Sequence, residues 1–167
     1  MHPGGAKIIG AFVAAAFLAG CSQTKAPAPQ PSDQPPPYVI GLGEIMGQNQ
    51  MRHAKLWFAG KDRNWPLAQY EIDELREGFG DAVTYDNHHK EVPRPLSELV
   101  PEFVGGPLDD LDKAVKAKDE TAFVASFDEL TAGCNGCHHE ANFGFNVITR
   151  PTAPPFTNQV FEPAAGG

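Results

Sequence analysis

This chain of 167 residues lacks several features that mark β-rich domains and common enzymes. No stretch of useful length alternates apolar and polar residues, so half-buried β-strands are not expected. The sequence contains no Ser-His-Asp arrangement and no pair of carboxylates that would indicate a hydrolase. The apolar run at residues 8–18 is also too short to span a membrane. These absences favour an all-α protein that is not an enzyme.

Cysteine is scarce, yet two of the three cysteines stand in one informative motif. Residues 134–138 read Cys-Asn-Gly-Cys-His, the Cys-x-x-Cys-His pattern that attaches a c-type haem. Each thiol adds to a haem vinyl group, and the histidine binds the iron from one side. On a helix the three side chains fall within one arc of ~100°. We therefore predict one covalent haem c on Cys134 and Cys137, with His138 as the proximal iron ligand.

The third cysteine ends a targeting segment. Lys7 gives a short positive region, an apolar run follows, and the segment closes with Leu-Ala-Gly-Cys at residues 18–21. This ending resembles the lipobox of bacterial lipoproteins, which implies a signal peptide over residues 1–20 and a diacylglycerol on Cys21. The resemblance places the protein on the periplasmic side of a bacterial membrane, and Ser22 at the next position favours the outer membrane. An ordinary secretory signal is the alternative.

Residues 21–37 form a Pro-rich segment, which predicts an extended, disordered tether between the anchor and a folded domain. After cleavage the chain would carry a formal charge of −9, against −8 for the whole sequence. A polyanion is a poor ligand for nucleic acid, so no nucleic-acid partner is expected. The charge fits a redox partner protein with a neutral or basic surface.

Helical spacing of apolar residues appears four times. The segments are residues 38–60, a helix capped by Asn64, residues 107–118, and a helix capped by Asp119. The acidic residues of the second helix, Glu71 among them, are expected on its solvent face. In the fourth helix the apolar stripe runs through Phe123, Phe127 and Leu130 into the two haem cysteines, so the motif should face the core.

Two Pro-rich or Gly-rich stretches are expected to lie outside the helices. Residues 92–106 contain three prolines and predict a long loop or crossover. Residues 142–167 predict an irregular tail in which four phenylalanines, at 143, 145, 156 and 161, suggest packing against the domain. The haem-binding domain would therefore be a four-helix bundle over residues 38–141.

A haem motif near the end of the last helix of an up-down four-helix bundle resembles the class II c-type cytochromes, of the cytochrome c-prime and c-556 type. Class I cytochromes c carry the motif near the N-terminus and a methionine ligand far downstream, whereas no methionine follows residue 137 here. The resemblance implies a haem protein that transfers electrons or binds gases, and it allows a homodimer. Residues 51–57 and 150–156 also look like segments of a less characterised group of bacterial cytochrome-like proteins.

The sixth iron ligand distinguishes these functions. Met46 and His53 lie seven residues apart on one face of the first helix, opposite the motif if the first and last helices run antiparallel. The resemblance to c-556 cytochromes favours Met46 as the distal ligand, with His53 or no protein ligand as alternatives. Met46 ligation would raise the reduction potential, and an open site would admit NO or CO.

The predicted function is therefore a membrane-tethered monohaem cytochrome c that carries single electrons. The alternatives are a five-coordinate gas-binding haem protein and a haem lipoprotein with a structural role in a respiratory complex. A zinc site made of the two cysteines with His138 and His139 is disfavoured because structural zinc sites draw ligands from two separate pairs. A thioredoxin-like pair would need a βαβ context that is missing. His88 and His89 are expected in a solvated loop.

Overall fold

The computed structural model describes residues 38–164. The predicted signal peptide, Cys21 and the Pro-rich tether lie outside the described residues. Within them every regular element is helical and no strand occurs, which confirms the all-α prediction. The elements are α1 (Leu42–Lys61), α2 (Trp65–Asp86), α3 (Leu96–Val100), the π-helical segment η1 (Pro101–Gly105), α4 (Gly106–Ala117) and α5 (Glu120–Glu140). No helix among these residues is long and apolar enough to cross a membrane.

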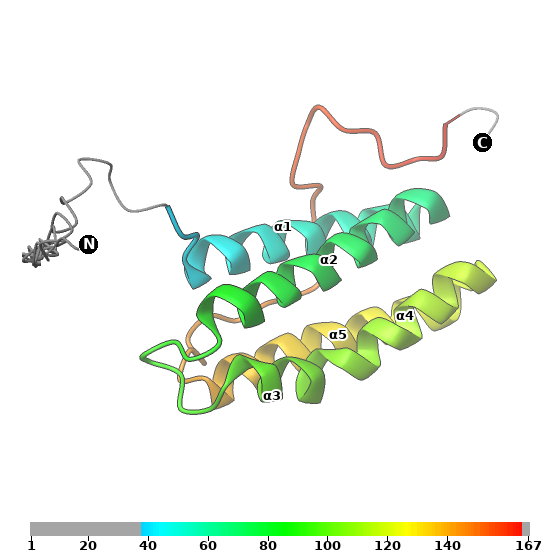
Figure 1. The fold of residues 1–167 in the computed structure, drawn as a ribbon. Helices are drawn as coiled ribbons and strands as arrows, with labels where there is room; N and C mark the ends of the chain where they lie inside the picture. Colours follow the sequence, from blue (N-terminus) through cyan, green and yellow to red (C-terminus); the bar gives the residue numbers. More distant parts are fainter. Residues whose placement is uncertain (1–37, 165–167) are drawn as a thin grey trace, which may run out of the picture. The chain divides into compact units, whose positions relative to one another are not determined.

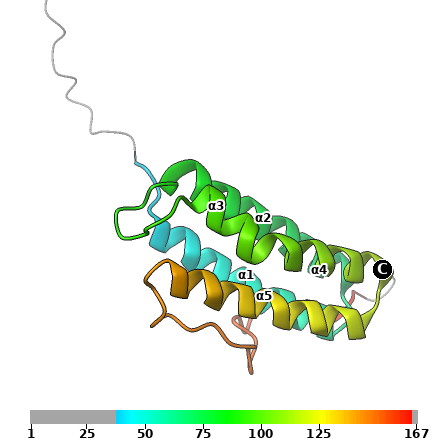
Figure 2. The ribbon, with the colours of Figure 1, turned by 90° about the horizontal axis from the view of Figure 1, so that it is seen from below.

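The long helices close around a shared core. Helix α1 packs on α2, α2 on α4, α4 on α5, and α5 on α1, so each long helix has two neighbours (Figures 1 and 2). The core is dominated by Phe123 and Phe127 of α5, both fully buried, with Trp57 of α1 stacked beside them. Large aromatic side chains supply much of the buried apolar area that holds a small domain together. This bundle-like packing brings segments distant in sequence to one site.

Both predicted N-caps are present. The side chain of Asn64 accepts a hydrogen bond from the backbone N–H of Leu67, and Asp119 accepts one from Ala122. Each cap satisfies a backbone donor that the first turn leaves unpaired. The first helix begins at Leu42, not at Tyr38, and its N-cap residue Gly41 makes no side-chain cap. Residues 38–41 therefore precede the helix, which corrects the predicted boundary.

The predicted loop at residues 92–106 is wrong in its second half, because α3 and η1 run from 96 to 105 and lead directly into α4. Two of its three prolines start a helical segment: Pro95 is the N-cap of α3 and Pro101 begins η1. Pro107, where a helix was predicted, lies in the first turn of α4. A first turn needs no N–H from these positions, so proline is tolerated there.

The expectation that Glu71 lies on the solvent face is also wrong. Its side chain is fully buried between α1 and α2, where its carboxylate forms a 2.5 Å ion pair with Lys55. Burial raises the pKa of Glu71. A pattern of neighbouring acidic residues does not reveal which of them meets a basic partner from another helix.

The tail is irregular after α5, as predicted, and part of it packs against the bundle. Ile148 and Phe161 are buried, Phe161 against Phe58 of α1. Arg150 pairs with Asp128 of α5, and its guanidinium lies 4.4 Å from the centre of the Trp57 ring. Two other phenylalanines of the tail, Phe145 and Phe156, are exposed.

Candidate functional site

A cavity of about 450 Å³ lies between the C-terminal half of α5 and the N-terminal half of α1. Its volume falls within the range of small-molecule and cofactor pockets. Helix α2, the α3–η1 segment and the first part of the tail complete its walls. All five predicted site residues of the described chain line it: Met46, His53, Cys134, Cys137 and His138. The sequence placed these residues on two helices, and the fold brings them to one cavity.

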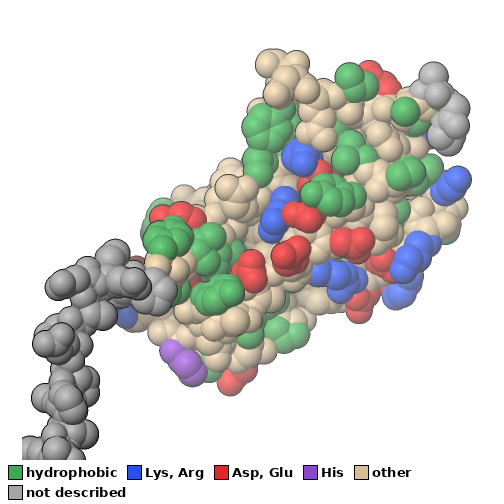
Figure 3. Space-filling view, turned by 45° about the horizontal axis from the view of Figure 1, so that its top comes forward, with side chains coloured by type: hydrophobic (Ala, Val, Ile, Leu, Met, Phe, Trp, Pro, Cys, Tyr) green, Lys and Arg blue, Asp and Glu red, His purple; other side chains and the backbone are tan. Residues whose placement is uncertain are grey.

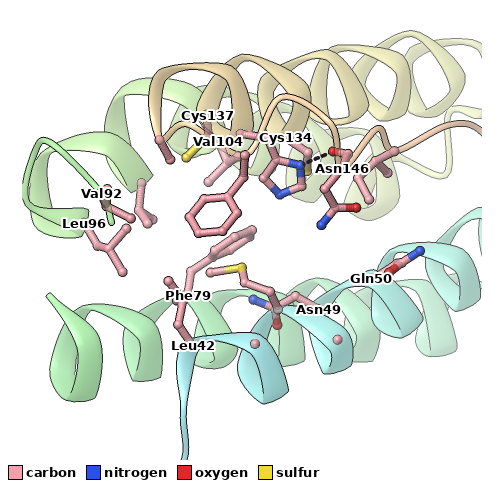
Figure 4. Close-up of a pocket in the computed structure, with 18 of the residues that line it drawn as sticks. Leu42, Asn49, Gln50, Phe79, Val92, Leu96, Val104, Cys134, Cys137 and Asn146 are labelled. Carbon is pink, nitrogen blue, oxygen red and sulfur yellow. Dashed lines mark hydrogen bonds between the residues drawn. The ribbon is translucent and has the colours of Figure 1, made fainter. Parts of the chain in front are cut away.

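The motif occupies the last turns of α5 and forms one wall of the cavity. Figure 4 shows Cys134, Cys137 and Asn146 on this side and Leu42, Asn49 and Gln50 of α1 on the other. Neither Cys134 nor Cys137 is in a disulfide. Burial, with Cys137 nearby, raises the pKa of Cys134 to about 12, and burial also raises the pKa of Cys137. Both thiols are therefore protonated at neutral pH, unlike the thiolate of a reactive redox dithiol.

The imidazole of His138 is held by the tail. Its Nδ1 lies 2.6 Å from the carbonyl oxygen of Asn146, drawn as a dashed line in Figure 4. A carbonyl only accepts, so Nδ1 carries the proton and Nε2 keeps its lone pair. Metal-binding histidines are commonly fixed in this way through the nitrogen that does not bind the metal. His138 thus has the tautomer that an iron ligand requires.

The two middle residues of the motif, Asn135 and Gly136, contact the tail and η1. Asn135 makes two 2.8 Å hydrogen bonds with the backbone of Ile148, one to its oxygen and one from its N–H. A Cβ at Gly136 would lie 2.9 Å from the ring of Phe103 in η1, so only glycine permits this close packing. Asn142 has a φ of 66° and turns the chain back over α5. Apart from the polar and small residue types at positions 135, 136 and 142, nothing in the sequence indicates these contacts.

Met46 and His53 differ in their surroundings. The Nε2 of His53 lies 2.9 Å from Oγ1 of Thr131, whose hydroxyl also bonds the carbonyl of Phe127 at 2.9 Å. Because that hydroxyl proton goes to Phe127, Oγ1 accepts the proton of Nε2. Burial lowers the pKa of His53 to about 4, so the ring is neutral. Nε2 is thus already engaged, whereas the Met46 thioether has no such bond among the described residues.

Two glycines give the α1 wall an open surface. Gly43 and Gly47 both line the cavity, and a Cβ built at either would meet no atom of the described chain within 4 Å. They lie four residues apart and hence on one face of the helix, beside Met46. Small residues there leave room for a flat group between α1 and the motif.

The cavity walls fit a covalently attached haem. Cys134 and Cys137 would carry the thioether links and His138 the iron, while Met46 stands on the opposite wall. Among residues 38–164 no group of three or more histidine, cysteine and acidic side chains is arranged to hold a bare metal ion. His89 also lines the cavity, where its ring packs edge-on against Phe143.

The chain was compared with known proteins. No family model, no curated protein and no solved structure matches it. The function of this domain is therefore inferred from the residues that line the cavity.

Proposed function

We propose that this protein is a monohaem c-type cytochrome that carries single electrons. One observation carries the proposal: Cys134, Cys137 and His138 line the same cavity as Met46, and the volume of this cavity is about 450 Å³. The bundle would be of the up-down class II type, with Cys134 and Cys137 holding the haem covalently. The haem, when bound, supplies a reversible one-electron iron couple. The chain positions it, excludes water and sets its potential.

His138 and Met46 supply the axial ligands in this proposal. The carbonyl of Asn146 orients His138. His53 has a structural role in this proposal, because its Nε2 is hydrogen-bonded to Thr131 and is not free to bind iron. Met/His ligation raises the potential of a c-type haem. Phe143, Asn146 and Ile148 of the tail line the cavity and would cover one side of the haem.

The lipid anchor remains part of the proposal on the strength of residues 18–21. Cys21 would tether the domain to the periplasmic side of a bacterial membrane, and the redox partner would be a protein with a neutral or basic surface. On the face shown in Figure 3, acidic and basic side chains lie interspersed, so the negative charge is not gathered into one patch there. A Cys21→Ser variant tests the anchor: it should leave the membrane fraction while keeping its haem.

The first experiment is the optical spectrum of the matured protein, oxidised and reduced, with and without CO. Sharp reduced bands that CO does not change would establish a six-coordinate electron carrier. Broad high-spin bands that shift with CO would contradict that assignment and favour the gas-binding alternative. If haem staining on a denaturing gel survived unchanged in Cys137→Ala, covalent attachment at the motif would be wrong.

Two further variants separate the axial ligands. His138→Ala should abolish the native spectrum, whereas His139→Ala, which removes the exposed neighbouring histidine, should preserve it. Met46→Ala should convert a six-coordinate spectrum to a high-spin one. An unchanged spectrum in Met46→Ala would remove Met46 as the ligand.

A further inference from the structure

The amide of Asn49 presents a buried hydrogen-bond donor that the chain does not use. The residue is 5% exposed, and its Nδ2 has no acceptor among residues 38–164. Leaving such a donor without a partner destabilises the folded chain, because the donor has lost its hydrogen bonds to water. Buried polar groups in native proteins are nearly always paired, so an unpaired one calls for a specific explanation.

The orientation of this amide is determined by its neighbours. Its Oδ1 accepts a hydrogen bond from the Arg52 guanidinium at 3.3 Å, and Arg52 is held in turn by Glu74 at 2.8 Å. A guanidinium only donates, so the end of the amide that faces Arg52 must be the oxygen. The nitrogen is therefore the free end.

Helix α2 packs against the Oδ1 side of the Asn49 amide. A Cβ at Gly78 would lie 2.0 Å from Oδ1 of Asn49, so the backbone of α2 comes into close contact on that side. The amide is consequently fixed between α1 and α2 and not free to rotate toward solvent. A donor held in this way is preorganised for an acceptor in the cavity.

Asn49 lies on the wall opposite the motif. It lines the cavity, three residues after Met46 on the same face of α1, and Figure 4 shows it across from Cys134 and Asn146. With His138 on the α5 wall, the α1 wall is the distal side of a haem held by the motif. A donor on that wall would be available to an atom bound on the side of the haem opposite His138.

We propose that Asn49 donates a hydrogen bond to the acceptor atom at the sixth position of the haem iron. The inference rests on the proposed haem site. Two sources of that acceptor share the same chemistry: the thioether sulfur of Met46, or the outer atom of a small diatomic ligand. In either case the donor withdraws electron density from the ligand and stabilises ferrous iron with its ligand.

The test compares Asn49→Leu, which removes the donor and keeps the volume, with Gln48→Leu, which changes an exposed amide of α1 outside the cavity. In the first arm the otherwise wild-type holoprotein is titrated for its midpoint potential. In the second arm the same changes are made in Met46→Ala, and the C–O stretching band of the ferrous CO adduct is recorded. Asn49→Ala serves as a second variant in both arms.

The donor is expected to act in at least one arm. A lower potential in Asn49→Leu, with the Gln48→Leu value unchanged, identifies the Met46 sulfur as the acceptor. A C–O band that moves to higher frequency identifies a diatomic ligand as an acceptor. Asn49 variants that match the Gln48 control in both arms overturn the proposal and leave Asn49 as a packing residue. Loss of haem from the unmutated chain would instead refute the haem site itself.

Discussion

The Nδ1 of His138 lies 2.6 Å from the carbonyl oxygen of Asn146, eight residues further along the chain. The tail that carries this carbonyl is anchored by Asn135, which bonds both backbone groups of Ile148. The orientation of the histidine in the motif therefore depends on a residue between the two cysteines. This connection makes the tail part of the site.

Asn135→Ala should loosen that segment. The variant loses two hydrogen bonds, which we expect to lower the free energy of unfolding by about 1–3 kcal/mol. Urea titration measures this loss, and the midpoint potential should change with it because His138 is less firmly held. Gln48→Ala is the control, since it truncates an exposed amide of α1 outside the cavity. Equal stabilities of the two variants would argue against the anchor.

The open α1 wall predicts the effect of filling the cavity. Gly47→Phe should fold, because a Cβ there meets nothing within 4 Å, but the ring would project into the cavity and reduce the haem bound per polypeptide. Gly80→Phe is a matched control: Gly80 is also helical and open, but it lies on α2 outside the cavity. Circular dichroism checks the fold and haem absorbance the loading. If Gly47→Phe bound as much haem per polypeptide as the unmutated protein, the haem would not occupy this cavity.

The buried imidazole of His53 predicts a dependence of stability on pH. Its pKa is about 4 in the folded protein against 6.5 for a free histidine, so between these values only the unfolded chain binds a proton there. Stability is then intact above pH 6.5 and falls as the pH drops toward 4, by roughly 3 kcal/mol. The free energy of unfolding is measured by urea titration at several pH values. Glutamine does not titrate, so His53→Gln should remove this part of the pH dependence. His88→Gln should keep it; equal slopes in all three proteins would contradict the assignment.

The buried ion pair between Lys55 and Glu71 predicts a large and asymmetric mutational effect. Lys55→Met leaves the Glu71 carboxylate buried without its partner, which should destabilise the protein by about 3–5 kcal/mol. Adding Glu71→Gln to this variant should restore much of the loss. Lys113→Met breaks an exposed pair with Asp110 and should leave the free energy of unfolding nearly unchanged, because water screens that pair. A similar small loss for Lys55→Met would show that Glu71 finds another partner or a proton.

Much of the site followed from the sequence because its signals are local. The motif at residues 134–138 fixes its own spacing, helical periodicity places its cysteines on the core side of α5, and Asn64 and Asp119 cap their helices within three residues. The position of Met46 on the facing helix required only the order of the helices along the chain. These features depend on residues within a few turns of each other.

Other features depended on contacts between distant segments. The prolines at residues 93, 95 and 101 predict a loop when considered alone, yet Pro95 and Pro101 begin helical segments that pack on α2 and α5. The burial of Glu71 depends on Lys55 from the preceding helix, and the free amide of Asn49 on Arg52, Glu74 and Gly78.

The sequence by itself determined the helical class and the chemistry of the motif, since periodicity and residue spacing are properties of short segments. Only the tertiary structure decided which groups meet in the cavity. It set Asn146 against His138, engaged His53 with Thr131, and left Asn49 with a donor facing the cavity. Hydrogen-bond partners and burial depend on positions in space, and residues 49 and 138 line one cavity only when α1 and α5 pack around one core.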